Sequence, residues 1–336
     1  MRFRLSLLLV ILFFSCGHNN DKPDISGIQV ELSTDRFEKS LFTIDSSQLA
    51  DKLDPLLGSY GDFGNHFLTT ILNANEEWPK DSLNQYVGSF VNSYKKIYDT
   101  AEMLFSDFSK YENQISTSLQ YLKYYFPNYK APKKIITYIG PLDGYGDIIT
   151  DDALIIGLHL HLGSHSSFYQ AEWFQETYPS YIYSRFEPEY IVVNSMKNII
   201  NDMFPVDGND DPLSFQMVEA GKRLYLLEKF IPDCEKFRII GYTKDQLSGC
   251  YDHEKAIWDL FIQNDLLQSI DKNIIKNYLG ESPKTQELGE ASPGNIGAFV
   301  GWQIVKKYMS KHSETTLDQL MKKNPEEIIQ QAKYKP

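Results

Sequence analysis

Two histidines separated by one residue are the first side chains in this sequence that could do chemistry. His159 and His161 flank Leu160, and His165 follows four residues after the second. If this stretch is a β-strand, both imidazoles point to the same face, because side chains alternate along a strand. Imidazole is a zinc ligand, but no cysteine and no carboxylate cluster at ligand spacing completes a set here. The stretch therefore predicts no metal site of its own.

The zinc-peptidase motif H-E-x-x-H does not occur intact. His161 and His165 have the spacing of its two histidines, but no glutamate follows His161. His253 and Glu254 begin the motif correctly, but Ile257 stands where the second histidine belongs. The motif needs two histidines as ligands and the glutamate as general base. Neither stretch can therefore make that site.

Other catalytic signatures are missing as well. The chain has no G-x-S-x-G nucleophile elbow and no G-x-x-x-x-G-K-S/T phosphate loop. A Ser-His-Asp triad is defined by geometry rather than by sequence order, so the sequence leaves that arrangement open. We expect no catalytic residue, no bound metal and no cofactor.

The N-terminus has the order of a bacterial secretory signal. Arg2 and Arg4 precede a run over residues 5–14 that is apolar except for Ser6, and Ser15 and Cys16 follow. The run is about half of the ~20 residues that cross a bilayer, so it indicates a cleaved segment. A small residue before a cysteine, with an apolar residue three places earlier, resembles a lipobox. The resemblance implies that Cys16 is the first mature residue and carries acyl chains on sulfur and nitrogen. A signal cleaved near Cys16 without lipid is the alternative.

The chain thus divides into three parts. Residues 1–15 are the predicted signal peptide, residues 16–27 a lipidated flexible tether, and residues 28–336 a single globular domain. The tether is polar and turn-forming and has nothing to bury. The whole chain is 42% hydrophobic and 14% aromatic, which is enough for a substantial core. No later apolar run is long enough to cross a bilayer.

Charge and cysteine content limit the partners. The net charge of −12 argues against nucleic acid and anionic lipid, because both would be repelled. Cys234 and Cys250 form either a disulfide, which an exported compartment permits, or two small buried thiols. One aromatic run could line a sugar site or belong to the core. It contains Tyr121, Tyr124, Tyr125 and Phe126.

The elements that must position these side chains are mainly helices. Alternation over residues 28–32 predicts a strand, and residues 134–139 and 153–160 predict two strands of a small central sheet. Apolar residues at helical spacing predict helices around residues 49–57, 83–97 and 115–122, with Asp81 capping the second. The C-terminal half predicts helices over residues 187–203, 213–229, 244–262, 266–278, 294–310 and 317–336. Asn324 followed by Pro325 is typical of a helix start.

Gly294, Gly297 and Gly301 mark one of the C-terminal helices. Glycines at such spacing let a second helix approach closely, so we interpret them as a packing device. The pattern as a whole predicts an α+β fold that is predominantly helical.

Four stretches together resemble one family. They read DALIIGL (residues 152–158), RFEPEYIV (185–192), EAGK (219–222) and PGNIGAFVGWQIV (293–305). In this order they resemble the gliding-motility lipoprotein family GldB of the Bacteroidetes, over nearly the whole mature chain. The resemblance implies a role in gliding motility and its envelope machinery, with no established enzymatic activity.

The family is also similar, remotely, to predicted zinc peptidases of the zincin type, which implies a zincin-like body. In that comparison the helix after Glu189 takes the place of H-E-x-x-H but has no histidine, and Glu219 matches the third ligand position. One carboxylate without two imidazoles does not hold catalytic zinc. We expect a degenerate metal site at Glu219, which would be paired with a lysine or arginine if it is buried.

The sequence therefore predicts a non-enzymatic lipoprotein of the cell envelope. It would be anchored in a membrane through Cys16, face the periplasm, and act by contacts with other envelope or gliding-machinery proteins. One alternative is a zinc metallopeptidase with an unorthodox site of His159, His161 and either Glu219 or Glu254. A glycan-binding lipoprotein is the other alternative.

Overall fold

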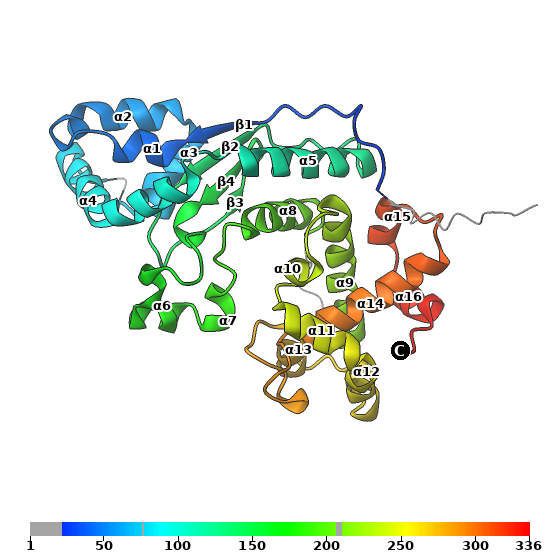
Figure 1. Ribbon diagram of the computed structural model, residues 1–336. Helices are drawn as coiled ribbons and strands as arrows, with labels where there is room; N and C mark the ends of the chain where they lie inside the picture. The colour runs from blue at the N-terminus through cyan, green and yellow to red at the C-terminus, as the bar shows by residue number, and fades with distance from the viewer. Residues whose placement is uncertain (1–21, 76, 206–209) are drawn as a thin grey trace, which may run out of the picture.

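The computed structural model describes residues 22–75, 77–205 and 210–336 (Figure 1). The predicted signal peptide and Cys16 lie outside the described residues. Four short strands form one sheet in the order β1-β2-β4-β3. Their bounds are β1 (Ser33–Arg36), β2 (Lys134–Tyr138), β3 (Ile148–Ile149) and β4 (Ala153–Gly157). β1 and β4 pair parallel to β2, and β3 pairs antiparallel to β4.

The long segment between β1 and β2 is helical. Its helices are α1 (Phe37–Phe42), α2 (Leu49–Ser59), α3 (Asp62–His66), α4 (Lys80–Phe105) and α5 (Ser109–Tyr125). Its shorter turns are η1 (Ser46–Gln48) and the π-helical η2 (Phe67–Ile71). Their apolar faces join one core with the sheet, which confirms the helices expected from the spacing. Asp81 lies in the first turn of α4 but makes no cap bond, so its predicted capping role is wrong.

The remaining helices follow β4. The first are η3 (Leu158–Leu160), η4 (Ser167–Gln170), α6 (Glu172–Thr177), α7 (Ser180–Tyr183), α8 (Tyr190–Met203) and α9 (Leu213–Phe230). The next are α10 (Lys236–Ile240), α11 (Lys244–Asp252), α12 (Glu254–Gln263), η5 (Leu266–Gln268) and α13 (Lys272–Leu279). The last are η6 (Gln286–Leu288), α14 (Ile296–Lys311), α15 (Leu317–Lys322) and α16 (Pro325–Ala332).

The predominantly helical α+β class with a small sheet is therefore confirmed, with local corrections. Residues 28–32 alternate in exposure as expected, but backbone pairing begins only at Ser33, whose N–H donates to Lys133 O. The helix expected over residues 244–262 is two helices, because the backbone of His253 leaves helical geometry. Asn324 accepts a hydrogen bond from Glu326 N, as predicted for the start of α16.

The tightest helix packing lies between α9 and α14. A Cβ added at Gly301 would lie 1.6 Å from Met217 O, and one added at Gly221 would lie 2.2 Å from the carbonyl carbon of Gly301. The two backbones therefore touch where both helices carry glycine. The close-packing role expected for the α14 glycines is present at this crossing.

The helices were also compared with the length and polarity of a bilayer span. Within the described parts of the chain, each helix is too short or too polar to cross a membrane.

Candidate functional site

His159 and His161 lie at the end of β4, where the sheet meets the loop over residues 140–147. The strand expected over residues 153–160 ends at Gly157, and Leu158–Leu160 forms the 3-10 turn η3. The two imidazoles therefore do not share a strand face, which corrects the sequence-based expectation. His159 Nδ1 accepts from Gly140 N at 3.1 Å, and its Nε2 donates to Tyr145 O at 3.1 Å. These bonds fix a neutral imidazole, and burial lowers the pKa of His159 to about 3.

His161 is held in the opposite charge state. Its Nε2 lies 2.9 Å from Asp147 Oδ2, and its Nδ1 lies 3.2 Å from Glu187 O. Because both partners are acceptors, both ring nitrogens donate, which requires an imidazolium. Burial opposes that charge, but the Asp147 carboxylate outweighs it and raises the pKa of His161. All four ring nitrogens of the two histidines are thus bonded within the protein.

Asp147 is the centre of this buried network. Its side chain is only 5% exposed and accepts from Asn194 Nδ2 at 3.0 Å and from Gly157 N at 3.2 Å. Asn198, one turn further along α8, donates its Nδ2 to Asp147 O at 3.0 Å. The network therefore ties the loop, β4 and α8 together. Sequence reasoning missed Asp147, and the only signal was a pair of asparagines four residues apart on an apolar helix.

The neutral state of His159 predicts a measurable acid sensitivity. The unfolded histidine binds a proton below about pH 6.5, whereas the folded one does so only near pH 3. The free energy of unfolding should therefore fall by up to about 1.4 kcal/mol per pH unit between these values. Folding raises the pKa of His161, so its contribution to the free energy of unfolding is constant below about pH 6.5 and falls only as the pH rises above that value. Urea unfolding from pH 7 to pH 4 would measure this effect. The free energy of unfolding should fall with decreasing pH more steeply for the wild type than for His159→Gln, because the wild type takes up one more proton on unfolding. Parallel curves would contradict the neutral state of His159.

Glu219 and Glu254 lie away from these histidines in separate contacts. Glu219 Oε1 accepts from Lys222 Nζ at 2.6 Å, and Arg223 Nη1 lies 3.4 Å from its Oε2. The Glu219 side chain is 36% exposed and therefore not buried, whereas that of Lys222 is 1% exposed, so the pair neutralises a buried cation. Glu254 Oε1 accepts from Tyr334 OH at 2.6 Å. In the part of the chain that the structure describes, no three His, Cys, Asp or Glu residues are grouped as metal ligands.

The two cysteines of the body are both free thiols. Burial raises the pKa of Cys234 to about 11 and that of Cys250 to about 12. Both therefore stay protonated at neutral pH, which makes them poor nucleophiles. The alternative of a disulfide between them is not what the structure shows.

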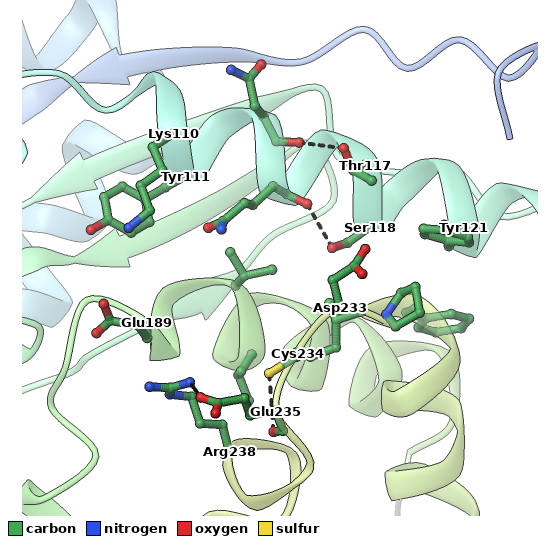
Figure 2. Close-up of a pocket in the computed structure, with 17 residues that line it drawn as sticks. Lys110, Tyr111, Thr117, Ser118, Tyr121, Glu189, Asp233, Cys234, Glu235 and Arg238 are labelled. Atoms are coloured by element: carbon green, nitrogen blue, oxygen red, sulfur yellow. Dashed lines mark hydrogen bonds and ion pairs between the residues drawn. The ribbon is translucent and has the colours of Figure 1, made fainter. Parts of the chain in front are cut away.

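One open cavity is a cleft of about 580 Å³ between α5, the start of α8 and the segment that joins α9 to α10 (Figure 2). We call it the α5–α8 cleft. One face of α5 forms its wall, with Lys110, Gln114, Thr117 and Tyr121 at helical spacing. Its floor is apolar and buried, and consists of Val192, Val193, Phe230 and Ile231. An apolar floor below a polar rim is typical of a binding site.

Charged side chains lie around the rim of the cleft. Arg238 pairs with Glu235 beside Cys234, and Asp233 points toward α5 and pairs with Lys22 (Figure 2). Glu189, at the start of α8, forms no ion pair with any described residue. Of the predicted aromatic run, Tyr121 lines the cleft, whereas Tyr124 is exposed and Phe126 is buried in the core. That run therefore does not form one aromatic surface.

Comparison with protein families decides the relationship of this chain. The family described as gliding motility protein GldB matches residues 18–336. The chain belongs to the GldB family. Neither the curated proteins nor the solved structures contain a match to it. The comparisons thus add nothing to the resemblance to zinc peptidases.

The stretches that resemble GldB build three of the regions described above, namely the buried polar network, the α5–α8 cleft and the contact of α9 with α14. Residues 152–158 form β4 and lead into the histidine turn, and residues 185–192 lead into α8 and the floor of the cleft. Residues 219–222 and 293–305 supply the glycines at the contact of α9 with α14. The GldB-like stretches therefore lie in the core, the buried polar network and the cleft.

Proposed function

We propose that this GldB-family chain is a non-enzymatic lipoprotein of the cell envelope that takes part in gliding motility by contacts with other proteins. Membership of the family supports the link to gliding. The observation that carries the rest is the α5–α8 cleft, which offers an apolar floor and a polar rim. Such a surface suits a protein segment better than it suits bond cleavage, because binding needs shape and burial whereas catalysis needs positioned reactive groups.

The polar network supports the absence of peptidase activity. A catalytic zinc needs three protein ligands and an open position. His159 and His161 have no ring nitrogen free for a metal, and Glu219 is paired with Lys222 and Arg223. Building the unorthodox site would require these contacts to break. The body instead presents a rigid surface, held at the membrane by the lipid on Cys16 and facing the periplasm.

Genetic complementation in a gliding host tests the proposal. Deletion of the gene should abolish spreading, and a Cys16→Ala allele should restore it poorly, because the body would no longer be held at the membrane. A Cys250→Ala allele is a matched control, since that thiol is free and lies in the body. Normal spreading of the deletion strain would refute a role in motility. Stoichiometric zinc in untagged purified protein would refute the non-enzymatic part and direct attention back to the peptidase alternative.

A further inference from the structure

The first described residues form a strap against the body. In this strap, residues 22–32, Ile28 O accepts a hydrogen bond from Gln120 Nε2 of α5 at 2.7 Å. Lys22 reaches Asp233 on the rim of the α5–α8 cleft. In Figure 1 the strap runs along α5 and turns past its C-terminal end. The chain toward Cys16 therefore leaves the body at the end of the cleft that contains Tyr121 and Asp233.

Chain length then places this end of the cleft near the membrane. Lys22 lies six residues after Cys16, and an extended chain spans at most about 3.5 Å per residue, so the separation is at most roughly 20 Å. A single exposed ion pair contributes little, and the side chain of Asp233 is 80% exposed. If that pair opens, the contact of Ile28 with Gln120 still limits the separation to roughly 40 Å. The cleft thus stays on the side of the body that the anchor holds close to the bilayer.

The cleft also indicates what could fill it. The wall of α5 and the buried apolar floor form a groove that suits the apolar side chains of a helical or extended segment (Figure 2). At the end away from Asp233, the carboxylate of Glu189 lies near Tyr111 and has no cationic partner among the described residues. A lysine or arginine of the bound segment would supply that partner, and the pair would be partly shielded from water.

We propose that the α5–α8 cleft is the docking site for a juxtamembrane segment of an integral membrane protein. The segment presents apolar side chains to Val192, Val193 and Phe230 and a basic side chain to Glu189. This proposal rests on the proposed lipid on Cys16, because the lipid is what brings the cleft to the bilayer. In this proposal the strap connects the body to the lipid and also sets the orientation of the body.

Energy transfer in vesicles tests the orientation. Full-length acylated protein would carry a fluorescent amino acid at Thr117 in the cleft or at Lys276 on α13, which lies away from α5 in Figure 1. An acceptor dye on lipid headgroups should quench position 117 more strongly than position 276. Asp233→Lys should reduce that difference. Equal or stronger quenching at position 276 would overturn the proposed orientation, whereas protein whose mass shows no acyl group would refute the proposed function instead.

Photo-crosslinking in gliding cells tests the occupant. A photoreactive amino acid at Thr117 should crosslink to a protein with a membrane-spanning segment, at a peptide next to that segment. Glu189→Lys should lower the crosslinking yield roughly tenfold, because a charge pair becomes a repulsion. Glu176→Lys, an equal charge change on exposed α6, should leave the yield unchanged. Crosslinks confined to proteins without a membrane span, or an unchanged yield with Glu189→Lys, would overturn the proposal.

Discussion

Replacing Gly301 by alanine is expected to destabilise the body by about 3 kcal/mol or more. The new methyl group would lie 1.6 Å from Met217 O, a backbone atom that cannot rotate away. Relief requires α9 and α14 to move apart, although most residues of α14 and half of those of α9 are buried. Overpacking a core by a methylene already costs about 1–3 kcal/mol where side chains can adjust. Urea unfolding followed by circular dichroism would measure the loss, and cells should contain less of the variant protein.

Gly249→Ala is the matched control for that experiment. Gly249 lies within α11, and an added Cβ there would meet no atom within 4 Å. Alanine is favoured over glycine in a helix by about 0.8–1 kcal/mol, so this variant should be as stable as the wild type or slightly more stable. Both substitutions gain the same helix propensity, and only Gly301→Ala loses packing. Equal stability of the two variants would show that α9 and α14 can separate without penalty.

The glycine contact also shows how far the sequence determines the fold. The spacing of Gly297 and Gly301 predicts that some helix approaches closely, because a helix face without side chains is useful only for packing. It does not predict that the approaching helix is α9 or that Gly221 faces Gly301. Periodicity is a property of one segment, whereas the choice of partner depends on the tertiary arrangement of segments distant along the chain.

The errors at element ends have the same origin. Residues 28–32 alternate between exposed and half-buried side chains, and alternation alone cannot tell a paired strand from an extended segment lying on a helix. The side-chain amide of Gln120 in α5 donates a hydrogen bond to Ile28 O, so pairing with β2 begins five residues later at Ser33. Likewise, the apolar pattern through His159 continues after β4 ends, because η3 is as buried as the strand.

The candidate sites differ in how visible they are from the sequence. Glu219 has Lys222 and Arg223 three and four residues away, at the spacing where helical side chains meet, so its pairing could be expected from the sequence. Asp147 could not be recognised, because its partners come from β4, from His161 directly after η3, and from α8. The α5–α8 cleft also combines residues from distant segments. Each of these sites exists only after the sheet brings those segments together.

The largest effect of a polar substitution is expected at Asp147. Removing one partner of a buried charge pair costs about 3–5 kcal/mol, because the remaining charge loses its compensation. In Asp147→Ala, His161 loses the carboxylate that raises its pKa, and Asn194 and Gly157 N lose their acceptor. Each unpaired buried donor adds a further penalty. The free energy of unfolding at pH 6 should therefore fall by about 3–5 kcal/mol.

Two control variants distinguish the loss of this network from the general effect of removing a carboxylate. Asp151→Ala removes an exposed carboxylate from the adjacent turn and should change stability by less than about 0.5 kcal/mol. Asp147→Asn keeps the shape and one acceptor oxygen, so its loss should lie between those of the other two variants. In Asp147→Asn, the pKa of His161, followed by the chemical shift of its ring protons, should fall because burial then acts without the opposing carboxylate. An unchanged pKa would mean that Asp147 does not hold His161 in its charged form, and the polar network would then have to stabilise α8 through the asparagines alone.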